Sequence, residues 1–455
     1  MLEGQKCLIV GSGLSGIGAV DLLEHFGADI VLYDSNEKMT REELEAKLPK
    51  GSKAECITGE LPAQVEESIQ AVVLSPGVPT DIPLVNRLRD RGVQILGEIE
   101  LGFLAEKGRV AAITGTNGKT TTTTLVGDIM KAHFGEDKTF VVGNIGNPYT
   151  LETLKTTEDT VTVGEISSFQ LETIHTFRPA VSAILNVTPD HLNRHHTMEA
   201  YVEAKEAIAS CQTKEDTCVL NYDNEYTKAF ADRCPAKVVF FSSKEALKDG
   251  YYLRGEKIVK SVNGEAEELM DIHTDMNLVG MCNVENVMAA IAIAEGMKVP
   301  MDTILSVIKQ FHAVEHRIEF VATKGGVDYY NDSKGTNPDA AIQGIKAMSK
   351  PTILIGGGYD KQSEYDEWIE SFDGKVKWLV LIGQTREKIA ECARKHGVEC
   401  IKFADTFDEC LQLCTELAES GDAVLLSPAC ASWGMFPNYE VRGKMFKEYV
   451  HGLED

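Results

Sequence analysis

Residues 114–121 read TGTNGKTT, and they lie between two patterned stretches. An apolar run at 110–113 precedes them and a helical pattern at 125–130 follows, which is the order of a strand, a glycine-rich loop and a helix. Gly115 and Gly118 let the backbone bend closely around an anion, and the amides at the start of the helix point at it. These glycines are three residues apart, whereas the general P-loop pattern places its glycines about five apart. The stretch still predicts a loop that binds phosphate.

Lys119 and Thr120 extend this interpretation to a nucleotide. Lys119 would reach the outer phosphates, and the hydroxyl of Thr120 would sit on Mg²⁺. The alternative is a Thr/Gly turn with a solvated lysine. Because Gly-Lys-Thr between a strand and a helix is a strong signal, we expect the chain to bind a nucleoside triphosphate.

The balance of 45 basic against 70 acidic residues gives a net charge of −25. Nucleic-acid-binding surfaces are usually basic and anionic membranes attract basic segments, so this charge favours neither partner. The eleven cysteines are scattered and include no Cys-x-x-Cys, which favours reduced thiols over a disulfide framework. The first residues show no apolar region of the signal-peptide type, so we expect no signal peptide. No apolar run approaches the ~18 residues that span a bilayer. We expect a cytoplasmic protein without a membrane span.

Strand-like apolar runs alternate with helical patterns along the whole chain, which predicts βαβ units and parallel sheets. The runs fall into three sets, and 455 residues leave room for three domains with separate cores. We place the domains at 1–97, 98–313 and 314–455. Residues 222–263 combine short strands with charged turns, and we expect an antiparallel flank there. The expected strands are 7–10, 30–33, 71–74 and 93–96, then 110–113, 140–142, 161–166 and 181–187, and finally 327–330, 352–355, 378–382 and 423–426.

Ligands of open parallel sheets bind beyond the carboxyl ends of the strands, so the residues that follow each strand are candidate site residues. In the middle set these are the phosphate loop, GNIG at 143–146, EISSFQ at 165–170 and NVTPDH at 186–191. Glu165 ends a buried strand, where a carboxylate near nucleotide phosphates would hold Mg²⁺. The alternative for Glu165 is a carboxylate that a helix N-terminus favours.

His191, His195 and His196 raise the question of a zinc site, because positions i and i+4 share one face of a helix. No cysteine or second acidic residue has a matching spacing, and the neighbouring phosphate loop calls for Mg²⁺. We therefore expect His195 and His196 to be surface histidines.

The first domain carries GSGLSG at 11–16 after its first strand, and Asp34 ends its second strand. Together they form a partial dinucleotide fingerprint, G-x-G-x-x-G with an acid. A site for the diphosphate of another nucleotide and a tight turn without a ligand are the alternatives. SPG at 75–77 closes a further strand at the same edge and could supply further amides.

The third domain has polar motifs at three of its strand ends. They are NDSKGTNP at 331–338, GGGYDK at 356–361 and SPACASW at 427–433. Two lysines and several hydroxyls at adjacent strand ends predict a surface that recognises anions. For each lysine alone, a solvated side chain is the alternative.

Taken in order along the whole chain, these motifs resemble those of the Mur ligase family. They are TGTNGKTT, GNIG, EISSFQLE, NVTPDHLNRH, EHRIEF at 315–320, NDSKGTNP, GGGYDK and LLSPACASW. NDSKGTN followed by SPACAS resembles the branch of the family that adds D-glutamate. The resemblance implies an α/β fold of three domains: an N-terminal Rossmann-like domain for a UDP-linked substrate, a central P-loop ATPase domain with a mostly parallel sheet, and a C-terminal Rossmann-like domain for an amino acid.

The activity that the resemblance implies is ATP-dependent amide formation, a step of peptidoglycan synthesis. ATP would phosphorylate the carboxylate of UDP-N-acetylmuramoyl-L-alanine, and the amine of D-glutamate would attack the acyl phosphate. Because a carboxylate is a poor electrophile and phosphate is a competent leaving group, catalysis would be mainly positioning and charge neutralisation. The implied cofactors are two Mg²⁺ ions and a carbamate that CO₂ forms on Lys205. We expect the enzyme to act as a monomer.

The resemblance also implies roles for individual residues. Lys119, Glu165, His191 and Lys205 would be catalytic, and Thr120, Glu165, His191 and carbamylated Lys205 would hold the metal ions. By its local pattern alone, Lys205 is an ordinary lysine on a helix surface. The residues that would contact ATP are Gly115, Thr116, Asn117, Gly118, Lys119, Thr120, Thr121, Asn283, Asn286, Arg317 and Asp332. Those for the UDP-linked substrate are Leu14, Ser15, Asp34, Ser75, Asn144 and Ser167, and those for D-glutamate are Lys334, Thr336, Lys361, Ser432 and Tyr439.

Three positions depart from the family pattern. Cys282 stands where histidine is usual, Asn36 where an arginine often helps to hold the uracil side, and Trp433-Gly434 replaces a common Leu-Asp pair. These departures predict altered contacts to adenine, UDP and D-glutamate. Among enzymes, the alternatives are a sibling Mur ligase and a folylpolyglutamate-type synthase, which lacks a first domain with a loop like 11–16. From other classes, the alternatives are a non-catalytic nucleotide switch and a nicotinamide oxidoreductase.

Overall fold

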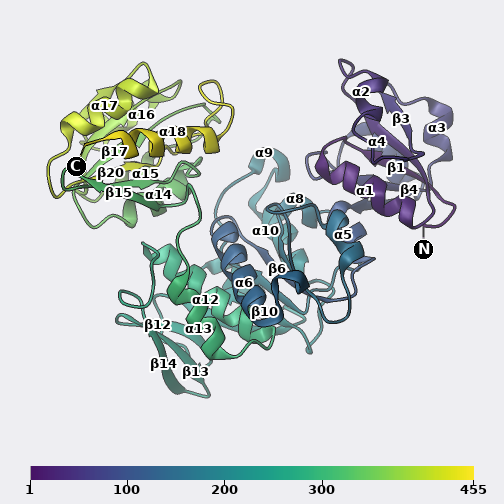
Figure 1. Ribbon diagram of the computed structural model, residues 1–455, viewed down its shortest axis with the longest axis horizontal. Helices are drawn as coiled ribbons and strands as arrows, with labels where there is room; N and C mark the ends of the chain where they lie inside the picture. Colours follow the sequence, from purple (N-terminus) through teal and green to yellow (C-terminus); the bar gives the residue numbers. More distant parts are fainter. Residues whose placement is uncertain (1, 455) are drawn as a thin grey trace. The chain divides into compact units, whose positions relative to one another are not determined.

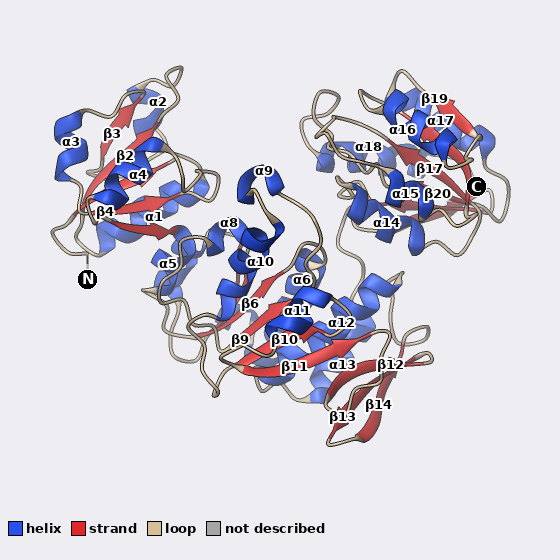
Figure 2. Cartoon of the chain, turned by 180° about the vertical axis from the view of Figure 1, so that it is seen from behind, coloured by secondary structure: helices blue, strands red, loops and turns tan. Residues whose placement is uncertain are grey.

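The computed structural model describes residues 2–454, except for the side chain of residue 193 (Figure 1). It contains three sheets of five, nine and six strands, flanked by helices (Figure 2). The expected three-domain α/β architecture is therefore confirmed. By its internal contacts the chain divides into two compact units. The first holds the chain up to Ile272 together with Asn286–Ile308, and the second holds His273–Glu285 and the chain from Lys309 onward. The domain boundaries near 97 and 313 stay predictions.

The first sheet is wholly parallel, with the strand order β3-β2-β1-β4-β5. Alternate residues of its central strand face opposite cores, since Cys7 and Ile9 join one apolar cluster and Leu8 and Val10 join the other. Burial on both faces explains why this strand has an unbroken apolar sequence. The elements are β1 (Lys6–Val10), α1 (Leu14–His25), β2 (Asp29–Asp34), α2 (Arg41–Glu45), β3 (Glu55–Thr58), α3 (Ala63–Ser68), β4 (Ala71–Leu74), α4 (Pro83–Asp90), β5 (Gln94–Gly97) and α5 (Glu98–Phe103).

The second sheet has the order β14-β13-β12-β11-β10-β9-β6-β8-β7 and is parallel from β7 to β12. In this sheet, β12 pairs with β13 and β13 with β14 in antiparallel fashion. The antiparallel flank expected at 222–263 is therefore correct for the second half of that range. In the first half, β11 is parallel to its neighbours. Its strands are β6 (Arg109–Thr114), β7 (Thr139–Gly143), β8 (Val161–Glu165), β9 (Val181–Ile184), β10 (Thr217–Asn221), β11 (Lys237–Ser242), β12 (Gly250–Arg254), β13 (Lys257–Val262) and β14 (Glu265–Asp271). The α-helices in this part of the chain are α6 (Lys119–Phe134), α7 (Tyr149–Glu152), α8 (Ser168–Leu171), α9 (Leu192–His195), α10 (Met198–Glu206), α11 (Glu225–Phe230), α12 (Met281–Gly296) and α13 (Met301–Gln310), with 3₁₀ turns at Glu136–Lys138, Thr153–Lys155 and Ala207–Ala209.

The third sheet has the order β15-β16-β20-β17-β18-β19, and only its edge strand β15 is antiparallel to its neighbour. Its inner strands again divide their side chains between two apolar clusters, one on each face. The elements are β15 (Glu319–Lys324), β16 (Val327–Asn331), α14 (Pro338–Lys346), β17 (Thr352–Gly356), α15 (Asp366–Glu370), β18 (Val376–Leu381), α16 (Arg386–Lys395), β19 (Ile401–Phe403), α17 (Phe407–Leu417), β20 (Ala423–Leu426) and α18 (Tyr439–Gly452).

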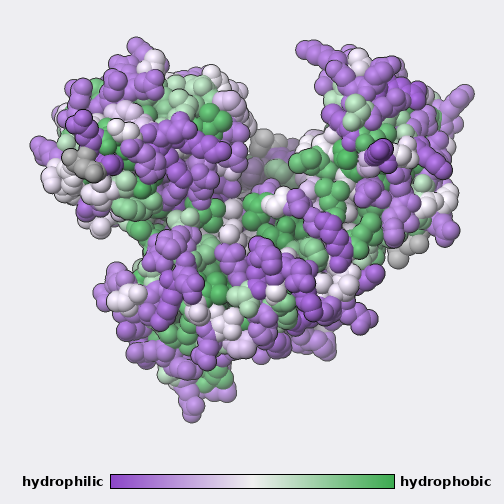
Figure 3. All heavy atoms as spheres, in the orientation of Figure 1, coloured by the Kyte–Doolittle hydropathy of each residue, from purple (hydrophilic) through white to green (hydrophobic). Residues whose placement is uncertain are grey.

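The surface agrees with the composition. The face drawn in Figure 3 is mainly hydrophilic, as a chain of net charge −25 requires. Within residues 2–454, no helix combines the length and the apolar character needed to cross a bilayer.

Trp368 of α15 tests the packing of the third domain. Its side chain is fully buried in one of the two apolar clusters, and its indole N–H has no hydrogen-bond partner among the described residues. We expect Trp368→Ala to lower the free energy of unfolding of this domain by ~3–5 kcal/mol, because it leaves a large cavity. Trp368→Phe keeps most of the packing and removes an unpaired donor, so it should cost far less. Calorimetry of the whole chain measures both, and equal losses would contradict this account.

Candidate active site

The phosphate loop connects β6 to α6, as its sequence predicts. Gly115 and Gly118 both have positive φ angles, at 153° and 85°, in backbone that favours glycine. Gly118 is the N-cap of α6, and no side chain caps the helix start there. Backbone amides at an uncapped helix N-terminus bind anions well. The geometry of this loop therefore suits a phosphate.

The loop is held in place by Asn186, which follows β9. The amide of Asn117 donates to Asn186 Oδ1 at 2.8 Å, and Asn186 Nδ2 donates back to the carbonyl of Asn117 at 3.1 Å. The amide of Thr116 donates to the carbonyl of Asn186 at 2.9 Å. Asn186 opens the strand-end motif at 186–191 that the sequence singled out, but no individual role was predicted for it.

Two lysines meet at this loop. Lys119 Nζ donates to the carbonyls of Gly115 and Thr116 at 2.8 and 2.9 Å. Lys205 Nζ, from α10, donates to the same carbonyl of Gly115 at 2.9 Å and lies 4.5 Å from the ring centre of Tyr201. Both amines therefore lie where the phosphates of a nucleotide would be held.

Lys205 corrects the expectation of a lysine on a helix surface. It is 2% exposed, because the loop and Tyr201 cover it. Burial, and then the nearby charge of Lys119, lower its pKa well below the usual value. Its amine is thus far more easily deprotonated than that of an ordinary lysine.

Glu165 ends β8 and is 1% exposed. Its Oε1 accepts a hydrogen bond of 2.6 Å from Asn144 Nδ2. Its Oε2 is also buried but has no hydrogen-bond partner in the described part of the chain. Leaving a buried carboxylate oxygen unpaired is costly, so a cation is the natural partner for it. Ser167, two residues on, caps α8 and accepts from the amide of Gln170.

The three histidines differ in their surroundings. His191 has a left-handed backbone and a half-exposed ring, whose Nε2 lies 3.6 Å from Asp190 Oδ2. His196 is exposed, as expected, but the expectation that His195 is a surface histidine is wrong. His195 is buried between the rings of Phe169 and Tyr201, with Nε2 2.9 Å from Ser168 Oγ and Nδ1 3.4 Å from Glu172 Oε1. Among the described residues, none of these histidines joins two other His, Cys, Asp or Glu residues whose ligand atoms all lie within 4.8 Å of one another, so a zinc cluster of that kind is absent here.

Four of the predicted UDP-side residues, Leu14, Ser15, Asp34 and Ser75, lie at or near the first glycine loop, and the other two, Asn144 and Ser167, follow β7 and β8 of the second sheet. Ser12 donates its amide to Asp34 Oδ2 at 3.2 Å and its hydroxyl to the same oxygen. Burial alone would raise the pKa of Asp34, but these hydrogen bonds and the amide of Asn36 lower it. Ser75 Oγ donates to the carbonyl of Gly11 at 3.2 Å, which fixes the turn against β4.

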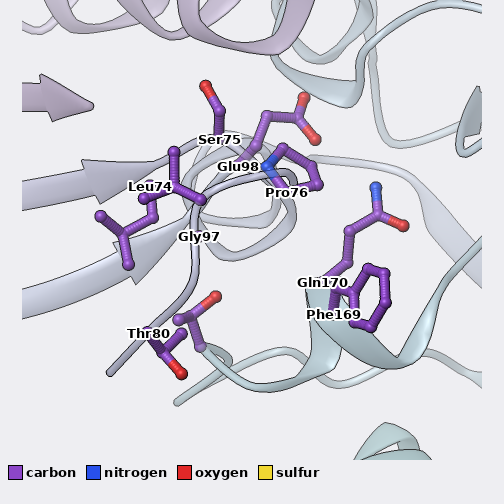
Figure 4. Close-up of a pocket in the computed structure, with 10 residues that line it drawn as sticks. Leu74, Ser75, Pro76, Thr80, Gly97, Glu98, Phe169 and Gln170 are labelled. Carbon is purple, nitrogen blue, oxygen red and sulfur yellow. The ribbon is translucent and has the colours of Figure 1, made fainter. Parts of the chain in front are cut away.

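Two further residues of this group lie at the start of α1, where Ser15 is half-buried and Leu14 is 77% exposed. An exposed leucine beside a glycine loop offers an apolar surface to a ligand. Near Ser75, a small pocket brings together the ends of β4 and β5 and the helix α8 (Figure 4). Its lining includes Glu98, which is buried and holds Thr150 by two hydrogen bonds of 2.8 and 2.9 Å.

In the second unit, Asp332 follows β16 and is buried. It accepts from Ser427 Oγ at 2.6 Å and from the amide of Ile318 at 3.3 Å. Burial raises its pKa to about 7, although Ser427 and the charge of Arg317 oppose this shift. Arg442 lies nearby and was not predicted from the sequence. It is 2% exposed and donates to Ser333 Oγ and to the Ser333 carbonyl at 3.0 and 2.7 Å, so it holds the strand-end loop.

Four of the predicted D-glutamate residues lie in loops that follow strands of the third sheet, and the fifth, Tyr439, begins α18. Lys334 Nζ lies 5.2 Å from the ring centre of Tyr439, and Lys361 Nζ lies 5.4 Å from that of Trp433. Thr336 donates its amide to the carbonyl of Lys334 at 2.8 Å. Ser432 is buried beside Trp433, whose side chain is exposed. Each lysine thus has an aromatic neighbour.

Asn283 and Asn286 are both buried on α12, and they fall in different compact units. Asn283 Nδ2 donates to the carbonyl of Val279 at 2.8 Å. Asn286 packs so closely on the phosphate loop that a Cβ at Gly118 would overlap its Oδ1. Burial raises the pKa of the neighbouring Cys282 thiol, which therefore stays protonated.

Comparison with protein families adds to this geometry. Three family models match in order along the chain: "Mur ligase MurD-like, N-terminal domain" at 5–97, "Mur ligase middle domain" at 113–294 and "Mur ligase, glutamate ligase domain" at 316–430. The chain belongs to the Mur ligase family.

Curated relatives of this Mur ligase match over its whole length. A UDP-N-acetylmuramoylalanine–D-glutamate ligase of Lachnoclostridium phytofermentans is 55% identical over 99% of both chains. The protein of the same name from Lachnospira eligens is 56% identical over 99% of this chain and 100% of the relative. That of Clostridioides difficile is 46% identical over 100% of both.

Solved structures of more distant Mur ligases share the fold. The UDP-N-acetylmuramate-alanine ligase MurC of Thermotoga maritima covers 98% of this chain and 99% of its own, with a TM-score of 0.60 at 18% identity. The match to MurF of Acinetobacter baumannii covers 97% of this chain and 93% of MurF, with a TM-score of 0.61 at 16% identity. The match to MurF of T. maritima, which was solved in complex with ADP, covers 99% of this chain and 96% of MurF, with a TM-score of 0.59 at 15% identity.

The buried His195 of this Mur ligase gives a prediction about pH. Burial lowers its pKa in the folded protein, although Glu172 opposes the shift. An unfolded chain, with an ordinary histidine pKa of about 6.5, takes up the proton more readily. The stability contributed by neutral His195 is therefore present above about pH 6.5 and is lost as the pH falls below it. We expect His195→Gln, which can still hydrogen-bond Ser168, to reduce this acid-side loss.

Urea unfolding of the full chain at neutral and mildly acidic pH measures the effect. His196→Gln is the matched control, because the side chain of His196 is exposed, and it should leave the pH dependence unchanged. A His195→Gln variant that loses as much stability in acid as the parent protein would disprove the role of His195.

Proposed function

We propose that this chain is an ATP-dependent ligase that joins D-glutamate to UDP-N-acetylmuramoyl-L-alanine in the cytoplasm, as a monomer, in peptidoglycan synthesis. The observation that carries the proposal is the pair of relatives with this ligase name, which are 55% and 56% identical over 99% of the chain. The geometry supports it, because the phosphate loop, Glu165 and two lysines supply what a phosphoryl-transfer site needs.

The reaction forms an amide from a carboxylate, which is a poor electrophile. The terminal phosphoryl group of ATP passes to the carboxylate oxygen of the alanyl group and leaves ADP. The amine of D-glutamate then attacks the carbonyl carbon, the C–O bond to phosphate breaks, and the amine loses a proton. The amides at the start of α6 and the amine of Lys119 would neutralise the phosphates during transfer.

Glu165 fits a magnesium-binding role. Its buried Oε2 has no hydrogen-bond partner among the described residues, and Mg²⁺ prefers oxygen ligands. Thr120 is the second residue of α6, directly after Lys119, as the P-loop pattern requires for a metal-bound hydroxyl. We assign two Mg²⁺ ions to Thr120, Glu165, His191 and a carbamate on Lys205. When bound, these ions would neutralise phosphate charge.

Lys205 fits carbamylation because of its surroundings. The reaction needs a neutral amine, whose nitrogen attacks the carbon of CO₂ and then loses a proton to leave a carbamate anion. Burial beside Lys119 lowers the pKa of Lys205 and so favours the neutral amine. The carbamate would place a negative charge beside the amine of Lys119, and its oxygens could hold a metal ion.

The remaining assignments divide by ligand. For ATP we assign the phosphate loop and a group of residues beyond it, which are Asn283, Asn286, Arg317 and Asp332. For the UDP-linked substrate we assign the residues around the first glycine loop and two from the middle domain, which are Leu14, Ser15, Asp34, Ser75, Asn144 and Ser167. For D-glutamate we assign residues from the loops after the strands of the third domain and from the start of α18, which are Lys334, Thr336, Lys361, Ser432 and Tyr439.

A panel of amino acids tests the proposed function. With ATP, Mg²⁺ and UDP-N-acetylmuramoyl-L-alanine present, we expect phosphate release only when D-glutamate is added. Mass spectrometry should then show the new amide. Release with L-alanine or a diamino acid in place of D-glutamate would assign the chain to another branch of the family, and nucleotide binding without any amide would indicate a switch protein.

Lys205→Arg tests the carbamate. Arginine keeps a positive charge at this position. Because it stays protonated, it has no neutral amine that could react with CO₂. We expect turnover to fall by about 100-fold or more, in line with losses seen when charge stabilisation in a transition state is removed. A ¹³C carbamate signal should appear in the parent protein under ¹³CO₂ and be absent from the variant. Lys214→Arg, at an exposed lysine of the same domain, is the control. Full activity in Lys205→Arg would reject the assignment.

A further inference from the structure

Away from the proposed active-site residues, two helices of the third domain bring a carboxylate, a thiol and an imidazole together. Asp366 is the first residue of α15, Cys392 lies on α16, and His396 directly follows α16. One ligand atom from each residue lies within 4.8 Å of the other two. We propose that Asp366, Cys392 and His396 form a binding site for Zn²⁺.

The spacing of these residues on their helices explains why they meet. Cys392 and His396 are four residues apart, so they share one face of α16, and Asp366 and Glu370 share one face of α15 in the same way. The two helices pack against each other, and the buried side chains of Trp368 and Ile369 anchor α15 in the core. Two rigid elements therefore present their side chains to one point, which suits a metal site better than loops do.

The distances are close to those that a zinc ion needs. Ligand atoms on one tetrahedral Zn²⁺ are about 3.3–3.8 Å apart, given bonds of about 2.0–2.3 Å. His396 Nε2 lies 2.9 Å from Asp366 Oδ1, and all three atoms lie within 4.8 Å of one another. Small side-chain rotations would bring the three atoms to these separations. Cys392 is largely buried while Asp366 is exposed, so water can fill the fourth position.

Glu370 supplies the second feature of a metal-binding histidine. Its Oε1 lies 3.6 Å from His396 Nδ1, on the opposite side of the ring from Asp366. Metal-bound histidines almost always donate the other ring N–H to a carboxylate, a carbonyl or water, which fixes the tautomer and the ring orientation. Glu370 is placed to accept a hydrogen bond from the Nδ1–H group of His396, which leaves Nε2 free to bind the metal.

The donor set selects the metal. A thiolate and an imidazole suit Zn²⁺, whereas Mg²⁺ and Ca²⁺ take oxygen ligands. Zinc binding would break the Cys392 S–H bond and release the proton to solvent, and the imidazole would bind as the neutral ring. The charges of the thiolate and of Asp366 then balance the two charges of the ion.

Such a site would stiffen the loop that carries Lys361. Asp366 starts α15 only five residues after Lys361. Lys388 of α16 already donates to the carbonyl of Ser363 in the same loop at 2.7 Å. A bound ion would add a second link between α16 and the end of this loop.

Titration of the full-length, metal-free protein with Co²⁺ and then Zn²⁺ tests the proposal. We expect one equivalent of Co²⁺ to give a thiolate-to-cobalt charge-transfer band, which Zn²⁺ abolishes and excess Mg²⁺ leaves unchanged. Cys392→Ser should remove the band and His396→Gln should weaken binding strongly. Glu370→Gln should lower the affinity by ~10–100-fold, since it removes only the orienting carboxylate. Cys400→Ser, at the exposed thiol of the same domain, is the control and should bind normally.

Circular dichroism of each variant separates lost binding from lost folding. His396→Gln changes a partly exposed residue at a helix end, so it keeps the test valid if Cys392→Ser does not fold. Zn²⁺ should also raise the melting temperature of the parent protein but not that of His396→Gln. Absence of the band, or a band that survives in both variants, would overturn the proposal without affecting the proposed ligase activity.

Discussion

The tight bend of the backbone between β6 and α6 is the constraint on which the central site depends. Gly118 adopts a left-handed conformation, and a Cβ there would overlap Asn286 Oδ1. Glycine at position 118 therefore allows the tight bend that a larger residue would prevent. With this bend the loop closes on Asn186, and the start of α6 has no side-chain cap. The same bend turns the carbonyl of Gly115 toward two lysines. Phosphate binding and the placement of both amines therefore have one origin.

Two ammonium groups that share one carbonyl repel each other, and burial removes the water that would screen them. The protein relieves this repulsion at Lys205, whose pKa falls well below that of an ordinary lysine. Glu165 has the opposite imbalance, a buried oxygen without a donor among the described residues. The middle domain thus contains an amine that is readily neutral and an unsatisfied carboxylate. Metal ions and a carbamate would resolve both.

The sequence predicts the inner strands well because burial on both faces demands unbroken apolar runs, as in β1 and β17. It misses the edge strands β3, β14, β15 and β19, because half-exposed strands need no such run. It also misses the inner strand β10, although that strand is buried and mostly apolar. Glu165 could be predicted because it ends a buried strand. The burial of His195 and Lys205 could not, because residues distant in the sequence cover them, such as Ser168 and Gly115.

The cluster on α15 and α16 shows the same limit in another form. Four-residue spacing of Cys392 and His396 is visible in the sequence, but it is common on helix surfaces and says nothing about a partner. The site exists only because α15 packs its own four-residue pair against that face. Its sulfur and nitrogen donors also differ in kind from the carboxylate oxygen of Glu165. The proposed zinc site would therefore take up little Mg²⁺, because Mg²⁺ prefers oxygen ligands.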